Sequence, residues 1–216
     1  AYGIPIVEHI DPEDESVQAV ILAPTRELAI QITDELRILY TYKPGIRAVC
    51  LYGGAPIGRQ IDALKKHPQI VVATPGRLSD HMKRRTVKLD NVKTVVLDEA
   101  DRMLDMGFSD DIMKIISYMP AERQTIMFSA TLPPKIRELA KTILRNPAEV
   151  NIAISKPNEA IDQSAYICYE RQKLGIIREL FAEPTDSKTI IFSSSKLKVK
   201  ELAHTLKRMK LNVAAM

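Results

Sequence analysis

Residues 95–104 read VVLDEADRML, and this stretch decides how the chain folds. The apolar run Val95–Leu97 is typical of a strand that is buried on both faces of a sheet. It leads directly into three carboxylates within four residues, Asp98, Glu99 and Asp101. Because like charges this close repel each other, we expect the fold to place a positive partner beside them.

Asp98 and Glu99 have the chemistry needed to hold a metal ion and a reactive water. A carboxylate directly after a buried strand is the arrangement with which P-loop NTPases hold Mg²⁺, a cation that usually keeps several waters. Glu99 would then orient or deprotonate the attacking water. The alternative is that Asp98 only caps the following helix, whose positive end favours Glu99 and Asp101.

Apolar runs alternate with amphipathic helices around this stretch, which predicts an α/β fold with a parallel sheet covered on both faces. The first helix carries Leu28, Ile32, Leu36 and Leu39 on one stripe. Ligands of such sheets bind beyond the carboxyl ends of the strands. The predicted strands are Val17–Ala23, Ala48–Tyr52, Ile70–Ala73, Thr94–Leu97 and Thr125–Phe128.

A small, hydroxylated or charged cluster follows each predicted strand, so we expect five clusters at one edge. Thr25-Arg26 and Thr74–Arg77 offer hydroxyl, N–H and guanidinium donors that suit a phosphate backbone. Each has a plainer interpretation. Thr74 can be a helix cap before Pro75, Gly53-Gly54 a tight turn, and Ser129–Thr131 a capping stretch.

The net charge indicates which partners suit the chain, and the distribution of charge indicates a domain boundary. The formal net charge is +4 and the pI is about 9.0, which is compatible with a polyanionic partner. Residues 1–155 hold 20 basic and 20 acidic side chains, whereas residues 156–216 hold 11 and 7. We therefore predict a first domain at 1–152, a linker at 153–160 and a second domain from 161 to 216. That second domain begins with expected strands at Tyr166–Tyr169 and Thr189–Phe192.

Cysteine usage and hydropathy bear on the compartment. Cys50 and Cys168 follow no metal-ligand spacing, which predicts a reducing, cytoplasmic environment. No apolar stretch approaches the roughly 18 residues that a membrane span needs. We expect no membrane partner and a monomer.

An ordered set of motifs resembles the DEAD-box family of ATP-dependent RNA helicases. The match runs over nearly the whole chain, and MLDMGF at residues 103–108 strengthens it. The motifs are PTRELAIQ (24–31), GG (53–54), TPGR (74–77), VLDEAD (96–101), SAT (129–131) and IIFSSSK (190–196).

The resemblance implies two RecA-like domains that close on ATP, Mg²⁺ and RNA. Asp98 would bind Mg²⁺ through water and Glu99 would position the attacking water. Asp101, Ser129 and Thr131 would couple the nucleotide to the RNA side. RNA, as single strand or short duplex, would be held by its backbone without base readout. The implied RNA contacts are Pro24, Thr25, Arg26, Gly53, Gly54, Thr74, Pro75, Gly76 and Arg77.

The chain also departs from the family pattern. It has no G-x-x-x-x-G-K-[ST] phosphate loop, no upstream glutamine motif, and neither of the arginine-rich motifs that end the second domain. The opening AYGIPIVEHI (1–10) resembles the helix that follows the phosphate loop, so we expect a fragment of a longer protein that is inactive alone. Ser194-Ser195 stands where the family often has Asn-Thr, and we assign no contact there.

Two other functions stay open at this stage. One is a non-catalytic RNA-binding scaffold that keeps the fold but has lost the nucleotide site. The other is a DNA-directed relative, which the completeness of the motif set disfavours. We expect 2′-hydroxyl contacts to decide between RNA and DNA.

Overall fold

The computed structural model describes residues 1–151, 160–182 and 188–215. Contacts divide the chain into one unit at Ala1–Val150 and another at Asn151–Met216. The predicted linker, 153–160, lies outside the described residues except for Ala160, so the proposed domain bounds stay a prediction.

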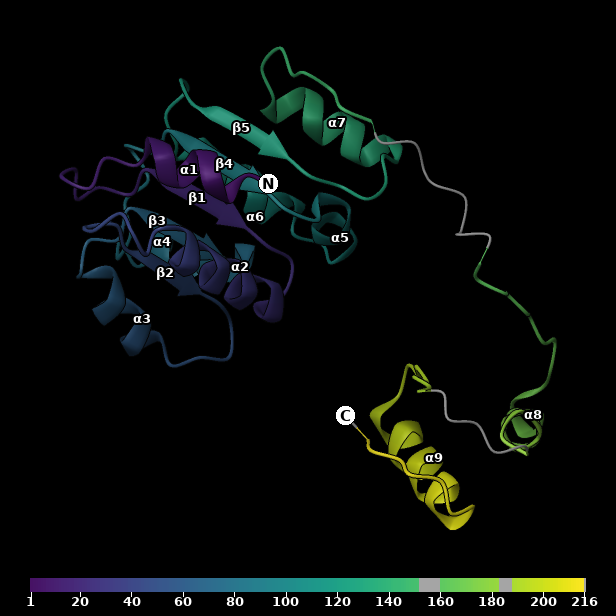
Figure 1. Cartoon of the computed structure of the whole chain (residues 1–216). Helices are drawn as coiled ribbons and strands as arrows, with labels where there is room; N and C mark the ends of the chain where they lie inside the picture. The colour runs from purple at the N-terminus through teal and green to yellow at the C-terminus, as the bar shows by residue number, and fades with distance from the viewer. Residues whose placement is uncertain (152–159, 183–187, 216) are drawn as a thin grey trace. The chain divides into compact units, whose positions relative to one another are not determined.

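The first unit is built on five parallel strands (Figure 1). Their order across the sheet is β2-β3-β1-β4-β5, which places the chain's first strand in the middle. The predicted parallel α/β fold is confirmed, and the strands are shorter than some of the apolar runs. They are β1 (Ala19–Leu22), β2 (Ala48–Leu51), β3 (Ile70–Ala73), β4 (Thr94–Leu97) and β5 (Gln124–Met127).

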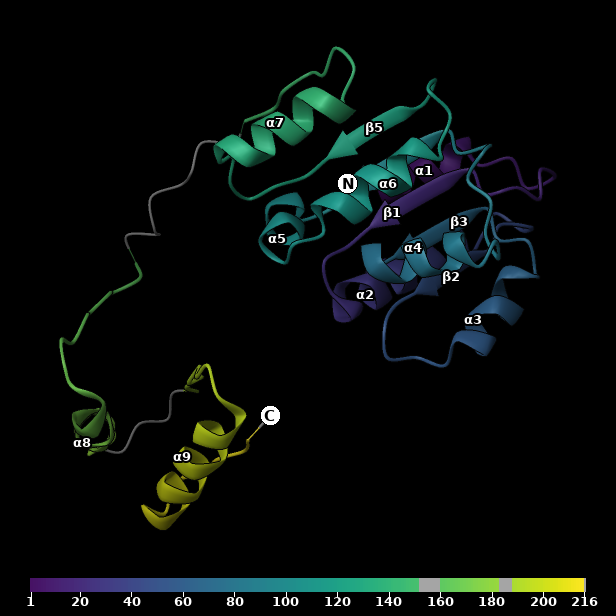
Figure 2. The same cartoon turned by 180° about the vertical axis from the view of Figure 1, so that it is seen from behind.

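Helices cover both faces of this sheet, as Figures 1 and 2 show from opposite sides. Alternate residues of β1 enter two separate cores: Ile21 packs with α1 and α2, and Leu22 packs with the helices of the other face. Strand residues that are buried on both sides explain the continuous apolar runs of the sequence. The helices are α1 (Gly3–His9), α2 (Arg26–Leu39), α3 (Ile57–Leu64), α4 (Pro75–Lys83), α5 (Ala100–Asp105), α6 (Ser109–Ser117) and α7 (Pro134–Ile143).

Helix α2 begins where the sequence places a cap. The Thr25 hydroxyl oxygen accepts a hydrogen bond from the Leu28 amide at 3.3 Å. Ile32 and Leu36 of the predicted stripe are buried, but Leu39 is 40% exposed near the end of the helix. The buried face is completed instead by Ala29 and Thr33.

The second unit differs from its predicted α/β pattern. Its described residues form η1 (Glu170–Gln172), α8 (Lys173–Leu180) and α9 (Lys196–Arg208). No strand forms in 160–182 or 188–215, so the expected strands at Tyr166–Tyr169 and Thr189–Phe192 are wrong. A strand exists only where a neighbour pairs with its backbone, and these segments find none among the described residues.

Candidate functional site

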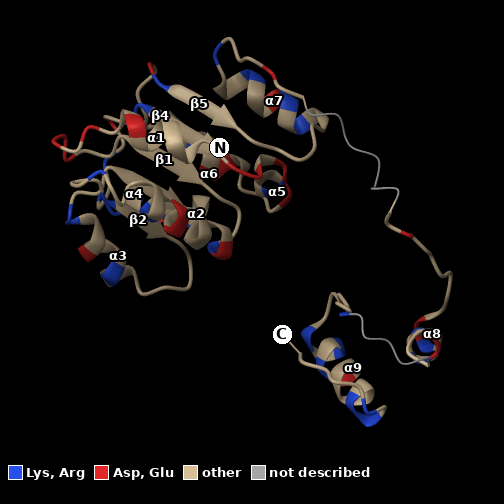
Figure 3. Ribbon diagram, viewed as in Figure 1, with Lys and Arg blue, Asp and Glu red and all other residues tan. Residues whose placement is uncertain are grey.

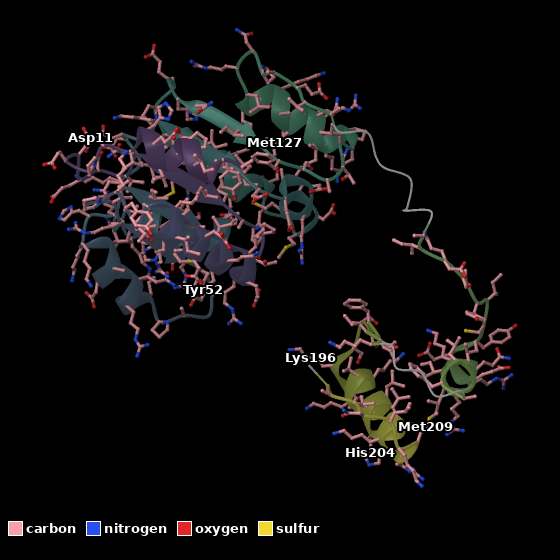
Figure 4. The ribbon with its side chains drawn as sticks, viewed as in Figure 1. Asp11, Tyr52, Met127, Lys196, His204 and Met209 are labelled. Atoms are coloured by element: carbon pink, nitrogen blue, oxygen red, sulfur yellow. The ribbon has the colours of Figure 1, made fainter. Side chains whose placement is uncertain are left out.

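The carboxyl ends of all five strands meet at one edge of the sheet. Leu22 of β1 pairs with Ala73 of β3 and with Leu97 of β4, and the outer strands continue this register. Leu51 pairs with Ala73, and Met127 pairs with Leu97. Figure 4 labels Met127 at the end of β5 and Tyr52 directly after β2. The five clusters predicted from the sequence therefore follow one aligned edge.

Asp98 is fixed immediately beyond β4. Its amide donates to the Leu22 carbonyl at 3.0 Å, which continues the strand pairing by one residue. One carboxylate oxygen accepts the Glu99 amide at 3.0 Å, and the other accepts the Tyr2 hydroxyl at 2.7 Å. The N-cap of α5 is Glu99, not Asp98. The half-buried carboxylate of Asp98 thus faces the edge without serving as that cap.

Glu99 holds a backbone conformation that few side chains adopt. Its φ and ψ are 50° and 52°, in the left-handed region. For a residue other than glycine this costs roughly 1–2 kcal/mol, and such strain is concentrated at functional sites. The carboxylate, 42% exposed, lies 3.1 Å from the Arg102 guanidinium. Its side chain is therefore held near solvent at the start of α5, where Figure 3 shows acidic residues gathered.

Asp101 joins α5 to the segment after β5. One carboxylate oxygen accepts both the Thr131 amide at 3.0 Å and the Thr131 hydroxyl at 2.7 Å. The Ser129 hydroxyl accepts the Asp101 amide at 3.3 Å and donates to the Thr131 carbonyl at 2.7 Å. Partial burial raises the pKa of Asp101, but the Thr131 hydrogen bonds and the Arg102 amide outweigh it and lower that pKa overall. Asp101 is thus held as a carboxylate at neutral pH.

The glycine pair and the arginine of TPGR meet at the other end of the edge. Gly54 has a φ of 85°, which favours glycine, and both glycines are exposed with open space around them. The Arg77 guanidinium donates to the Ala55 carbonyl at 3.1 Å. Pro75 is the first residue of α4, and Thr74 makes no side-chain capping bond. The Thr74 hydroxyl therefore accepts no hydrogen bond from the first turn of α4.

The cluster after β1 lies between these two groups. Pro24 is buried, Thr25 caps α2, and exposed Arg26 pairs with Glu27 at 3.0 Å. Among the described residues, no hydrogen bond joins this cluster to the acidic group or to the Arg77 group. The structure thus assembles two networks, Asp101 with Ser129 and Thr131, and Arg77 with the turn at residues 53–55.

The sequence matches the model of the DEAD/DEAH box helicase family over residues 1–139. The chain belongs to this family. Two relatives, the DEAD-box ATP-dependent RNA helicases CshA of Bacillus licheniformis and Bacillus subtilis, are each 46% identical over 211 residues. That alignment covers 95% of this chain and 42% of either relative, so the chain spans less than half of their length.

A solved structure is similar over the whole chain. It is the crystal structure of a DEAD box protein from the hyperthermophile Methanococcus jannaschii, with a TM-score of 0.67 and 37% identity. This chain covers 57% of that protein. The likeness agrees with a RecA-like DEAD-box fold for the sheet and its flanking helices. Among the helices of the described residues, none has the length and apolarity to cross a membrane.

At this edge, Mg²⁺ would need waters and the phosphates of a bound nucleotide in addition to a protein carboxylate. Within the described residues, no three His, Cys, Asp or Glu side chains form a metal cluster. Mg²⁺ is commonly held by one or two carboxylates together with waters and substrate phosphates. Asp98 fits this mode, because each of its oxygens accepts one hydrogen bond and keeps another lone pair.

Tyr2 is a contact of the DEAD-box motif that sequence reasoning missed. Its hydroxyl donates to Asp98, and its ring packs against Phe128 with centroids 5.3 Å apart. Burial first, and the Asp98 hydrogen bond second, raise the pKa of Tyr2 above its usual value. The partners are 96 positions apart in the sequence, so no local pattern indicates the contact.

Replacing Tyr2 with phenylalanine is expected to lower the free energy of unfolding by about 1 kcal/mol, because Asp98 loses a charge-assisted hydrogen bond in a partly buried place. Urea unfolding measures the change. Tyr118→Phe is the matched control, since Tyr118 is 61% exposed. Equal stability of Y2F and Y118F would show that the bond contributes nothing.

Proposed function

We propose that this chain is the central part of an ATP-dependent RNA helicase, with domain bounds at 1–152 and 161–216. RNA-stimulated ATP hydrolysis would unwind or remodel short RNA duplexes. The observation that carries the proposal is the single aligned edge, where the acidic group after β4 and the donor groups after β1, β2 and β3 lie side by side. The names of the two Bacillus relatives agree with it.

The acidic end of the edge is assigned to ATP. Asp98 would hold Mg²⁺ through water, and bound Mg²⁺ would neutralise phosphate charge. Glu99, with its exposed carboxylate, would orient the attacking water and accept its proton. Asp101 would transmit the state of the nucleotide through Ser129 and Thr131 to the RNA side.

The other clusters are assigned to RNA. Hydroxyl groups, guanidinium groups and exposed glycine backbone are suited to phosphate and sugar, which carry no sequence information. The proposed contacts are therefore independent of base sequence. A monomer in the cytoplasm completes the proposal, with single-stranded RNA and short RNA duplexes as substrates.

Arg26→Ala and Arg77→Ala, each in the full-length protein, are expected to weaken RNA binding equally for unrelated sequences. For each variant, the plot of the logarithm of the RNA association constant against the logarithm of salt concentration should become less steep by about 1, because one phosphate contact is lost. Fluorescence anisotropy with two RNAs of different sequence measures both effects. A change in base preference would argue against backbone-only contact.

The decisive experiment compares ATP turnover of the full-length protein without nucleic acid, with RNA and with DNA of the same sequence. We expect stimulation by RNA and little by DNA, together with separation of a short RNA duplex in the presence of ATP. RNA binding without turnover would instead identify the scaffold. Equal stimulation by DNA would identify the DNA-directed relative.

A further inference from the structure

A chain of buried polar side chains lies beneath the turn at residues 53–55. His81 of α4 is fully buried, and Gln60 of α3 is 6% exposed. The His81 Nε2 atom lies 3.0 Å from the Gln60 Oε1 atom. The Nδ1 atom of the same ring lies 2.8 Å from the Thr86 hydroxyl. The sequence predicts no functional role for Gln60, His81 or Thr86.

Gln60 connects this chain to the proposed RNA contacts. Its Oε1 atom also accepts from the Arg77 guanidinium at 3.3 Å. Its Nε2 atom donates to the Tyr52 carbonyl at 3.0 Å. Tyr52, which Figure 4 labels, is the residue before the glycine pair. Because a guanidinium only donates and a carbonyl only accepts, these two partners fix which end of the amide faces each of them.

The orientation of Gln60 determines the state of His81. Since Oε1 is an acceptor, His81 Nε2 carries the hydrogen. Burial first, and the Arg77 charge second, lower the pKa of His81 and keep the ring neutral. Nδ1 then has no hydrogen and can only accept from the Thr86 hydroxyl, whose single hydrogen goes either to Nδ1 at 2.8 Å or to the main-chain oxygen of His81 at 3.1 Å. The histidine therefore acts as a fixed donor behind Gln60.

Gln60 is placed to restrain both an arginine and a turn. Arg77 uses Nη1 for Gln60 and for the Ala55 carbonyl. A guanidinium has five donors, so others stay available for an anion at the edge. A side chain that only filled the core would not need to reach the arginine and the Tyr52 carbonyl at once.

We propose that Gln60, supported from behind by His81, is a positioning residue that holds the Arg77 guanidinium and the turn after β2 in the geometry that an RNA phosphate requires. The inference rests on the proposed function, because it takes Arg77 as an RNA contact. It adds that Gln60 acts through Arg77 and touches neither RNA nor ATP.

A double-mutant cycle with the full-length protein tests this. Gln60→Met keeps the side-chain volume and removes both amide groups. It should raise the RNA concentration for half-maximal ATPase stimulation about fivefold, roughly the loss of one hydrogen bond, while kcat at saturating RNA stays within about twofold. In an Arg77→Ala background, Gln60→Met should change that concentration less than about twofold, because the group that it positions is gone.

Three further measurements keep the outcome clear. Gln60→Glu retains acceptors for Arg77 and His81 but cannot donate to the Tyr52 carbonyl, so its RNA half-saturation should lie between those of the unmodified protein and Q60M. This variant keeps the proposal testable if Q60M folds poorly. Arg59→Ala, at an exposed arginine of the same helix, should leave half-saturation unchanged. Thermal unfolding reports stability separately. Equal effects of Gln60→Met in both backgrounds, or a lower Tm without a shift in half-saturation, would overturn the proposal. Unchanged half-saturation in Arg77→Ala would overturn it as well. Failure of RNA to stimulate ATP hydrolysis by the unmodified protein would instead overturn the proposed function.

Discussion

Glu99→Gln in the full-length protein is expected to reduce the rate of ATP hydrolysis by about 10²–10⁴-fold, the range that a positioned general base contributes. The amide keeps the size of the carboxylate and can still contact a water. It cannot accept the proton of that water, so only the chemical step is lost. ATP and RNA affinities should stay within about twofold, since neither depends on this proton acceptor.

Asp105→Asn is the matched control for Glu99→Gln. Asp105 ends the same helix, is exposed, and loses the same charge on substitution. Single-turnover hydrolysis and equilibrium binding of ATP and RNA distinguish the two variants. Unchanged turnover in E99Q would refute the role of Glu99, and an equal loss in both variants would reduce it to an effect of net charge.

The fold of the first unit could be predicted because its three central strands, β3, β1 and β4, are buried on both faces. Ile70–Ala73 and Thr94–Leu97 read as short apolar runs, and the structure forms strands over those same residues. Comparable runs at Tyr166–Tyr169 and Thr189–Phe192 do not form strands in the described residues, where Phe192 is 91% exposed. A pattern gives the propensity for a strand, whereas the strand itself depends on its pairing neighbour.

The site could be predicted as far as topology determines it. Parallel strands align their carboxyl ends, so residues that follow strands are brought to one edge whatever their separation in sequence. Side-chain contacts depend on packing instead. Tyr2 with Asp98 and Gln60 with His81 join different elements, and no periodicity indicates either pair. The left-handed backbone of Glu99 has no sequence signal either, because glycine is the usual residue there.

Thr131→Val is expected to separate ATP hydrolysis from RNA unwinding. Valine keeps the shape of threonine but removes the hydroxyl that donates to Asp101 at 2.7 Å, while the amide bond at 3.0 Å remains. One of the two hydrogen bonds from Thr131 to the Asp101 carboxylate is lost, while the Ser129 hydroxyl still accepts the Asp101 amide. We expect duplex unwinding by the full-length protein to fall about tenfold, equivalent to one charge-assisted hydrogen bond, with ATP turnover within about twofold.

The pH dependence of stability provides an independent readout of the same bond. The pKa of Asp101 is lowered in the folded state, so its contribution is present above the usual carboxyl pKa of about 4 and is lost as pH falls through the lowered value. Removing the hydroxyl moves that pKa back towards its usual range. The difference in unfolding free energy between the unmodified protein and T131V should therefore be about 1 kcal/mol at neutral pH and shrink in acid.

Thr142→Val on α7 is the control for both readouts, because its hydroxyl donates only to the Glu138 carbonyl of its own helix at 2.9 Å. It should leave unwinding unchanged and alter stability equally at acid and neutral pH. If T131V loses ATP turnover and unwinding in parallel, the bond serves the chemistry of hydrolysis and not its transmission to RNA. Asp101 would then belong with Glu99 in function as well as in sequence.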